Sequence, residues 1–289
     1  MAFDPLLYAA LAIGVVVGHF ARPKGPWVGR AQLATVVVLV GLLGATLSSV
    51  PWPTLLGAIP LALSFVLVML GITAAVYLGI ARNPKPHPAP VSSPPPDRTI
   101  PVSPLLIASL VAGLWLGTVV RIPAAGLLEY VLYLLLGLIG LDLVVRWSSL
   151  SRVWEPLTAA TAGAIAAAVL FVTLRLVPLR PALASAFGFG FYSLTGPIVT
   201  ERAGAVLGLF AFLVNFLRED LTMILSPLVG RRLGGGGLAA FGGATSMDTT
   251  LMFVTRYGEP EAGSLSIANG LILTVAAAIL VPAVFSIAV

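Results

Sequence analysis

A line of polar side chains runs along an otherwise apolar stretch near the C-terminus. Asn215, Glu219, Thr222 and Ser226 follow one another at steps of three and four residues, so a helix would place all four on one face. A carboxylate in the middle of a bilayer costs at least about 2.5–3.5 kcal/mol on insertion scales, and therefore faces a helix bundle or an aqueous cavity. Glu219 could bind a cation or a proton there, or it could form a structural ion pair with Arg218 or another arginine.

Two segments rich in Gly, Ser and Thr surround this helix in the sequence. Residues 187–195 read FGFGFYSLT, and residues 241–249, which begin 54 positions later, read FGGATSMDT. Asn215 and Asn269 keep the same separation. In lipid, irregular backbone is tolerated only where protein buries it or where water fills a neighbouring cavity. We therefore expect a duplicated unit, in which a broken hairpin is followed by a helix, with a binding site where the hairpins meet.

The polar groups of these two units could complete a pocket around Glu219. Half-helix N-termini can bind a carboxylate group, and unwound carbonyl groups can bind a cation or an ammonium group. The alternative is that the hydroxyl groups bond only to backbone carbonyl groups of a kinked helix. The candidate pocket residues are Asn215, Tyr192, Ser193, Thr195, Thr245, Ser246, Asp248 and Asn269.

Three further carboxylates each have a structural alternative. Asp248 could face a ligand or cap the returning half-helix of the second hairpin. Asp220 points about 100° away from Glu219 on a helix, and we favour a structural pairing with an arginine. Asp142 lies four residues before Arg146, so a pair within one helix is favoured over a second acidic site.

The composition is that of a polytopic membrane protein. Of 289 residues, 58% are hydrophobic and 9% are charged, which leaves too few polar side chains to cover a soluble domain. The lack of Cys and the presence of only two His exclude thiolate and histidine-cluster metal sites, so we expect neither a metal nor a cofactor. Phosphate-binding loops, hydrolase motifs and basic runs with interleaved aromatic residues are missing, so we predict neither an enzyme nor a nucleic-acid-binding protein.

The N-terminal part of the chain predicts a scaffold of two repeats. Gly14-x-x-x-Gly18 in the first apolar segment matches Gly113-x-x-x-Gly117 in the fourth, each with Arg four residues later, and such faces allow close helix contacts. Three spanning helices per repeat is an odd number, so the second repeat is inverted in the membrane. The apolar segments are residues 5–21, 31–49, 54–81, 104–120, 125–146 and 153–177; the repeats are 1–81 and 104–180, joined by a proline-rich cytoplasmic linker at 82–103.

The C-terminal part of the chain is predicted to be a transport domain. Most Lys and Arg residues of the loops fall on the side opposite the N-terminus, which predicts a multi-pass protein of the cytoplasmic (inner) membrane with both termini outside. The fold is then all-α, with eight transmembrane helices, two re-entrant hairpins and inverted-topology repeats, in an order similar to that of elevator-type glutamate transporters. Within residues 181–289 we expect a hairpin at 182–202, a helix at 203–229, a flexible glycine-rich loop at 230–237, a hairpin at 238–258 and a helix at 263–288.

The C-terminal motifs resemble the LysO-type lysine exporter family. The matching segments are GFGFYSLTG at residues 188–196, the pair Arg218-Glu219, and GATSMD at residues 243–248. The resemblance implies export of L-lysine or a related cationic amino acid, and it gives Glu219 the place of a membrane-embedded glutamate that the family uses in transport. The family's acidic residue in the first half of the chain has no counterpart here between Asp4 and Asp97.

These observations lead to a hypothesis of lysine export by proton exchange. Moving one cation out of an inside-negative cell costs about 2.3 kcal/mol per 100 mV, and exchange for one proton removes that electrical cost. Glu219 could hold a proton or an ammonium group, but not both. We expect a homodimer in the lipid bilayer. The alternatives are an exporter or antiporter for another amino acid or small organic ion coupled to sodium, and a membrane scaffold that transports nothing.

Overall fold

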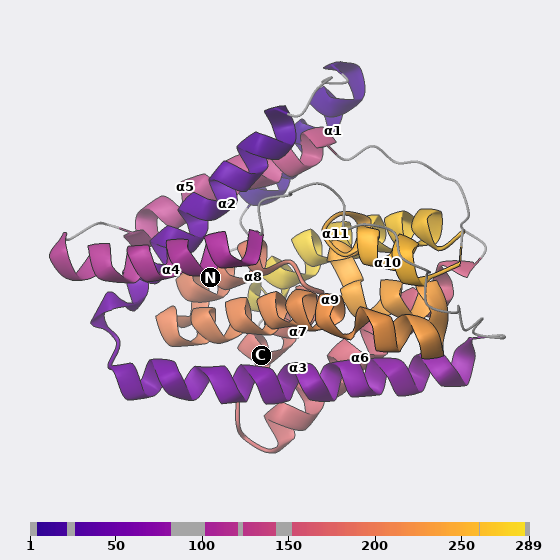
Figure 1. Cartoon of the computed structure of the whole chain (residues 1–289). Coiled ribbons are helices and arrows are strands. Elements are labelled where there is room, and N and C mark those ends of the chain that lie inside the picture. The colour runs from indigo at the N-terminus through magenta and orange to yellow at the C-terminus, as the bar shows by residue number, and fades with distance from the viewer. Residues whose placement is uncertain are drawn as a thin grey trace.

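The computed structural model describes residues 5–21, 27–81, 102–120, 124–142, 152–259 and 261–286, and within these ranges it contains helices and no strands (Figure 1). The proline-rich linker predicted at 82–103 lies almost wholly outside the described residues. The helices are α1 (Pro5–Ala21), α2 (Trp27–Thr46), η1 (Leu47–Ser49), α3 (Trp52–Ile80), α4 (Val102–Val119), α5 (Ala124–Asp142), α6 (Trp154–Thr173), α7 (Leu179–Phe187), α8 (Tyr192–Ala203), α9 (Ala205–Gly242), η3 (Gly243–Met247), α10 (Leu251–Tyr257) and α11 (Ala262–Ser286).

Several of these helices are suited to a bilayer. Among the described residues, four are long and apolar enough to cross a membrane: Trp27–Ser49, Trp52–Ile80, Trp154–Thr173 and Ala262–Ser286. Two shorter apolar helices, Pro104–Val119 and Gly126–Leu138, accompany them. This content agrees with a multi-pass membrane protein, as the composition predicted.

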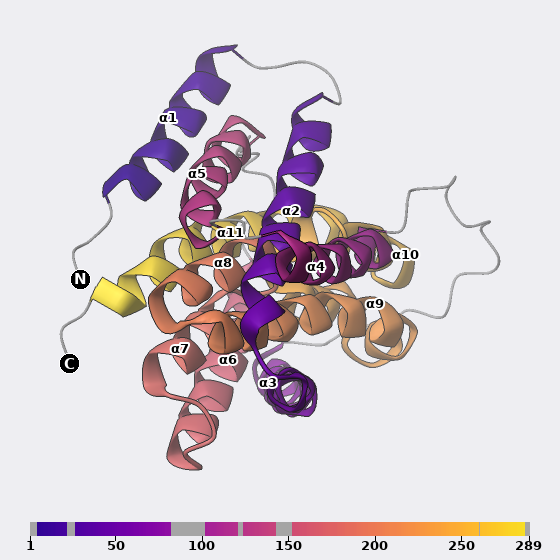
Figure 2. The same ribbon diagram turned by 90° about the vertical axis from the view of Figure 1, so that its left-hand side faces the viewer.

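Four N-terminal helices form an outer layer. Helix α1 packs along α5, α4 packs along α2, and α2 also contacts α5; Figure 2 shows α1, α5 and α2 together on one side of the C-terminal helices. The first helix of each predicted repeat thus packs on the second helix of the other repeat. Such reciprocal packing is the arrangement that two repeats related by a two-fold axis produce.

The glycine faces that were predicted to bring helices together do so. A Cβ atom added at Gly113 would overlap the backbone carbonyl oxygen of Gly41, and one added at Gly18 would lie 2.5 Å from that of Leu141. The first contact joins α4 to α2, and the second joins α1 to α5. A side chain at either glycine would force two helices apart.

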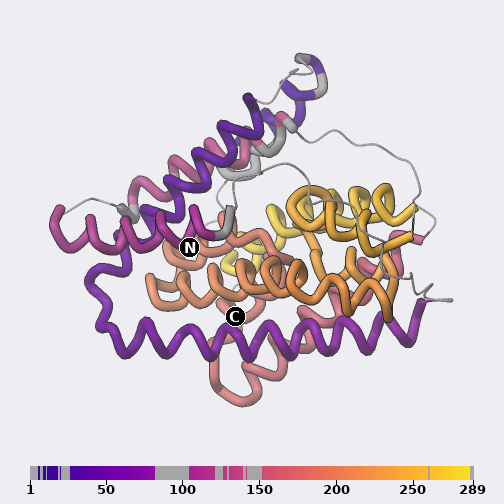
Figure 3. The backbone as a smooth tube through the Cα atoms, in the orientation of Figure 1, coloured from indigo at the N-terminus to yellow at the C-terminus, as the bar shows by residue number. Residues whose placement is uncertain are grey.

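The third helix of each repeat belongs to a central bundle with the C-terminal helices. Helix α3 packs along α6 and α9, and the tube in Figure 3 shows α3 running beside α9. The ring of Phe65 lies edge-on to those of Phe171 and Phe210, with centroid distances of 4.8 and 5.6 Å. Buried residues of α3, α6, α7, α8, α9 and α11 share one hydrophobic core, which also includes Leu39 of α2 and four leucines of α5. The proposed division between scaffold and transport domain stays a prediction.

The glycine-rich segment predicted as a flexible loop at residues 230–237 contains a sharp kink. Helix α9 consists of two helical segments that meet at Gly234, which has non-helical angles of φ 69° and ψ −170°. A Cβ atom at Gly235 would overlap Ala262, and one at Gly236 would overlap the hydroxyl group of Tyr77. The helix therefore breaks inside the predicted segment, but the glycines after the kink are buried contacts that let α9 approach α11 and α3, and they do not form an exposed loop.

Both predicted helix breaks are present. Residues 188–191 separate α7 from α8, and η3 with the following turn separates the end of α9 from α10. Phe189 has φ 51° and Gly243 has φ 64°, although these residues lie 54 positions apart. Both breaks therefore contain a residue with positive φ at the equivalent position, which is uncommon for a residue with a bulky side chain such as Phe189. The breaks differ at the next position, where Gly190 has φ 102° and Ala244 does not have a positive φ.

Candidate functional site

The two helix breaks are in direct contact. The N–H group of Ala244 donates a hydrogen bond of 2.8 Å to the carbonyl oxygen of Phe189. Segments far apart in the sequence therefore meet in the central bundle, as predicted for a site between hairpins. Because a break exposes backbone groups that a continuous helix would satisfy, each one needs polar partners from its surroundings.

Asn215 supplies those partners for the first break. Its Nδ2 donates to the carbonyl oxygens of Ser185 (3.0 Å) and Ala211 (2.9 Å), and its Oδ1 accepts the N–H of Gly190 at 2.8 Å. The side chain is 1% exposed. Asn215 therefore holds the first break in place, and its amide group is fully used in doing so.

Asn269 forms the corresponding hydrogen bonds at the second break. Its Nδ2 donates to the carbonyl oxygens of Ala239 (2.9 Å) and Gly243 (3.2 Å) and to Oγ of Ser246 (3.0 Å). Ser185 and Ala239 differ by the same 54 positions as the two asparagines. The candidate pocket thus contains two equivalent asparagines whose described bonds are structural.

Arg218 joins α9 to both breaks. Its guanidinium group is fully buried, with Nε donating to the carbonyl of Phe241 at 2.9 Å and Nη2 donating to that of Ala240 at 3.0 Å. It also lies 5.8 Å from the ring centroid of Phe189. A cation at the C-terminal end of a half-helix is stabilised by the helix dipole. These bonds direct Arg218 to the second hairpin, away from the ion pair with Glu219 that was the structural alternative.

Glu219 is a buried carboxylate with spare bonding capacity. It is 4% exposed, and its Oε2 has no hydrogen-bond partner among the described residues. The Thr249 side chain and the carboxylates of Asp248 and Asp220 lie close enough to Glu219 to act on it electrostatically. Tyr192 is within electrostatic reach of the same three carboxylates. This acidic cluster extends from the exposed Asp248 to the buried Glu219, and such a cluster attracts cations.

Tyr192, beside the acidic cluster, belongs to a group of three aromatic rings. The ring of Tyr192 lies 5.7 Å from those of Phe212 and Phe216, which stack on each other at 5.5 Å. Aromatic faces can contact a bound cation. Our sequence reasoning missed both phenylalanines, although their positions three and seven residues before Glu219 put them on the same helical face.

Several of the predicted hydroxyl groups bond to backbone carbonyl groups. Thr195 donates to Phe191 at 2.8 Å, and Thr245 donates to Gly242 at 3.0 Å. Ser246 donates to the carbonyl groups of Gly243 (2.7 Å) and Ser266 (2.9 Å). The alternative offered from the sequence therefore describes these three residues. Ser193 lies buried in the first turn of α8.

The remaining acidic candidates differ in their surroundings. Oδ1 of Asp248 accepts the N–H of Thr249 at 2.6 Å, just before α10 begins. Asp248 thus makes a local backbone bond, but the N-cap of α10 is Thr250, so the predicted capping of the half-helix by Asp248 is not observed. The ligand-facing role stays a prediction. Asp220 is half-buried beside Glu219. Asp142 ends α5, but its side chain and Arg146 lie outside the described part of the chain.

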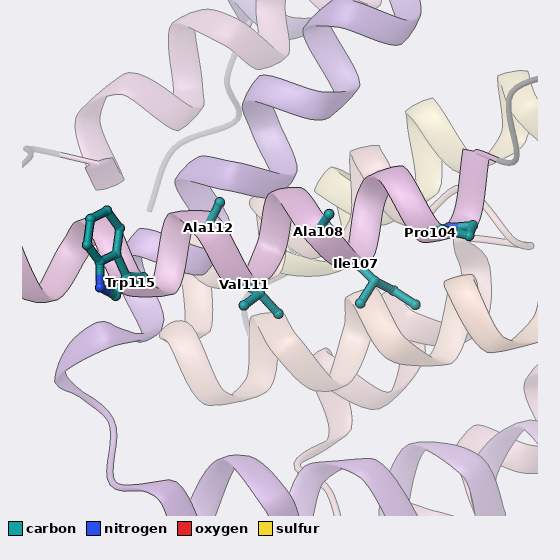
Figure 4. Close-up of a pocket in the computed structure, with 6 residues that line it drawn as sticks. All are labelled: Pro104, Ile107, Ala108, Val111, Ala112 and Trp115. Carbon is teal, nitrogen blue, oxygen red and sulfur yellow. The ribbon is translucent and has the colours of Figure 1, made fainter.

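A separate cavity of about 590 Å³ lies along α4 (Figure 4). Its lining is apolar, and Trp115 is 64% exposed. An ammonium group would find no acceptor among these side chains, whose polar group is the indole N–H of Trp115, so the acidic cluster remains the candidate site. The lining residues are Pro104, Ile107, Ala108, Val111, Ala112 and Trp115.

Comparisons with known proteins agree with the motifs. A family model described as lysine exporter LysO matches residues 107–285, which include both helix breaks and Glu219. The "Lysine exporter LysO" of Escherichia coli (strain K12) is 36% identical over 163 residues, covering 53% of each protein. A relative from Haemophilus influenzae (strain ATCC 51907 / DSM 11121 / KW20 / Rd), provisionally named a lysine exporter, is 29% identical over 149 residues, covering 50% of this chain and 76% of the relative.

The chain spans about half the length of the Escherichia coli relative in this match. No solved structure matches the chain. The comparison therefore rests on sequence, and it covers the region in which the helix breaks, the buried arginine and the acidic cluster lie.

Proposed function

This chain belongs to the lysine exporter LysO family, and from that premise we propose that it exports L-lysine, or a related cationic amino acid, in exchange for protons. The family is one of transporters, which is not a class of enzymes. Exchange of one lysine cation for one proton is electrically neutral, so the membrane potential would not oppose export. Export of this kind would take place across the cytoplasmic membrane.

The observation that carries this proposal is the unpartnered Oε2 of Glu219. A buried carboxylate without a counter-charge is costly, and either a proton or an ammonium group would neutralise it. Only one of the two can occupy the same oxygen, which couples export of one to entry of the other. Asp248 and Asp220 add negative charge beside it, and Tyr192 provides an aromatic surface for the substrate.

The geometry of the breaks supports a transporter with moving parts. Eight transmembrane helices and two re-entrant hairpins would place both breaks inside the bilayer, with the chain termini outside. The central bundle would carry the site across the membrane against the outer layer, and the outer layer of two copies would form a homodimer. Two features support this arrangement, namely the positive φ at the equivalent residues Phe189 and Gly243 and the reciprocal packing of α1 on α5 and α4 on α2.

Lysine counterflow in proteoliposomes tests the proposal. Purified protein is expected to take up labelled lysine against an internal pool of unlabelled lysine. In a second assay with lysine outside the vesicles only, net lysine uptake should remove protons from the lumen and alkalinise it. Glu219→Gln keeps the size of the side chain but cannot exchange a proton, so it should abolish lysine-driven proton movement. Glu261→Gln, an exposed position at the start of α11, is the matched control and should retain transport.

Two results would overturn the assignment. Proton movement at the wild-type rate by Glu219→Gln would remove this residue from the coupling site. Lysine movement that follows an imposed sodium gradient and ignores a pH gradient would replace the proton by sodium as the coupling ion. A chain that moves no amino acid under any gradient would support a membrane scaffold.

A further inference from the structure

The two equivalent asparagines differ in one bond. Asn269 is fully buried, and its Oδ1 has no hydrogen-bond partner among the described residues. In the first hairpin, Oδ1 of Asn215 accepts the N–H of Gly190. An unpaired amide oxygen in a buried site is unfavourable, so the difference between the two hairpins calls for a physical reason.

The missing partner can be identified from the repeat. Gly190 corresponds to Ala244 at the separation that relates the two asparagines, so the N–H of Ala244 is the group that Asn269 would bind if the hairpins were equivalent. That N–H instead donates to the carbonyl oxygen of Phe189 in the first hairpin. Because Nδ2 of Asn269 keeps the equivalent bond to Ala239, its amide group is already oriented as Asn215 is.

We propose that the second break is a two-state latch. In the closed state described here, the N–H of Ala244 binds Phe189 and joins the two hairpins, while Oδ1 of Asn269 stays unpaired. In the released state the same N–H binds Oδ1 of Asn269, as Gly190 binds Asn215, and the carbonyl of Phe189 is freed. The N–H of Ala244 binds a different acceptor in each state, so each state leaves one acceptor unpaired. The closed and released states can therefore be close in free energy.

Gly243 gives the latch a second, independent marker. It has φ 64°, and a Cβ atom added to it would overlap the carbonyl oxygen of Phe189 and lie 2.9 Å from Nη2 of Arg218. The closed state therefore requires glycine at this position. The equivalent residue of the first hairpin is Phe189 itself, which carries a large side chain with φ 51°. The first hairpin thus accommodates a side chain at this position. Gly190, the counterpart of Ala244, has φ 102°, which Ala244 would adopt only with strain, so the released state shares the bond to the asparagine and not the whole geometry of the first hairpin.

The latch lies beside the acidic cluster. Asp248 and Thr249 follow Ala244 closely in the chain, and both act on Glu219. Release of Ala244 from Phe189 would allow these two residues to move relative to α9. The latch is thus a gate for the candidate site, and it is a property of the fold whichever solute or coupling ion is used.

Spin-label distance measurements on the full chain test the latch. The sequence contains no Cys, so labels can be placed at Met252→Cys in α10 and Leu179→Cys in α7, both exposed. Gly243→Ala should increase the released population relative to the closed one, because its Cβ excludes the closed state. Asn269→Ala should decrease the released population, because the released state loses the acceptor of the Ala244 N–H. We expect changes of about two- to tenfold in the population ratio, the effect of one neutral hydrogen bond.

Opposite shifts by the two substitutions support the latch, because a merely structural loss of bonds would loosen the hairpin in both. Gly57→Ala, at which an added Cβ atom has no neighbour within 4 Å, is the control and should leave the ratio within about twofold. Shifts of the population ratio in the same direction for Gly243→Ala and Asn269→Ala overturn the proposal. A spin-label distance distribution for Gly243→Ala that equals that of the labelled parent also overturns it. If Asn269→Ala does not fold, the Gly243→Ala result decides alone.

Discussion

The contact between Gly236 and Tyr77 allows a double-mutant test of how the second hairpin is fixed to α3. A Cβ atom at Gly236 would overlap the Tyr77 hydroxyl group and lie 3.1 Å from Cζ and 3.5 Å from Cε2 of the ring. Tyr77 is 3% exposed and has little room to move. Gly236→Ala should therefore destabilise the protein, and Tyr77→Phe should relieve most of that loss.

The magnitude follows from two opposing contributions. Overpacking a close contact costs about 1–3 kcal/mol, while replacing Gly by Ala in a helix contributes about 0.8–1.0 kcal/mol of stability. Gly236→Ala alone should lose up to about 2 kcal/mol. In the Tyr77→Phe background the hydroxyl overlap is absent, so the same substitution should be neutral or stabilising, which gives a coupling energy of about 1–2 kcal/mol.

Thermal unfolding in detergent, followed by tryptophan fluorescence, measures this coupling. With roughly 2–4 °C per kcal/mol for a protein of this size class, Gly236→Ala should lower Tm by several degrees and the double variant should recover most of them. Gly57→Ala is the matched control, because no atom lies within 4 Å of a Cβ added there. Additive effects of Gly236→Ala and Tyr77→Phe would refute the contact and the packing of the second hairpin against α3.

Three further substitutions test other contacts of the described structure. Arg218→Met should lower Tm strongly, because two charge-assisted hydrogen bonds of about 1.5–3 kcal/mol each are lost. The Tm of Arg218→Lys should lie between those of Arg218→Met and the parent protein. Equal Tm values for all three proteins would contradict the role of Arg218 as a buried hydrogen-bond donor. Gly113→Ala should lower Tm by a few degrees, since its Cβ would overlap the Gly41 carbonyl; an unchanged Tm would mean that α2 and α4 do not cross there. Glu259→Gln should speed hydrogen exchange at Gly235, whose N–H binds Oε2 of Glu259 at 2.9 Å; unchanged exchange would show that this bond does not protect the amide.

The helix breaks could be predicted because their signal is local and occurs twice. Clusters of Gly, Ser and Thr in an apolar chain conflict with a continuous spanning helix, and their repetition at a constant separation, together with the two asparagines, is not expected by chance. The buried position of Glu219 could be predicted for a similar reason, since a carboxylate on an apolar helix must face the protein interior. The proposed crossing of the membrane by eight helices remains a prediction.

The glycine run misled the sequence interpretation because glycine has two uses. In isolation, four consecutive glycines favour a flexible loop. In the folded chain, Gly235 and Gly236 are buried contacts against α11 and α3, and only Gly234 uses its conformational freedom. The aromatic pair Phe212 and Phe216 was missed because apolar residues on an apolar helix carry no local signal of their position.

The sequence by itself determined the all-helical membrane class, the two helix breaks and the acidic residue between them, because composition, periodicity and repetition are properties of the chain. Only the tertiary structure decided the partners of each polar group. Arg218 binds carbonyl oxygens in place of a carboxylate, and Asn269 keeps an oxygen unpaired while its expected donor binds Phe189. Hydrogen bonds between distant segments depend on which atoms the fold brings within about 3 Å of each other, and no local pattern specifies that choice.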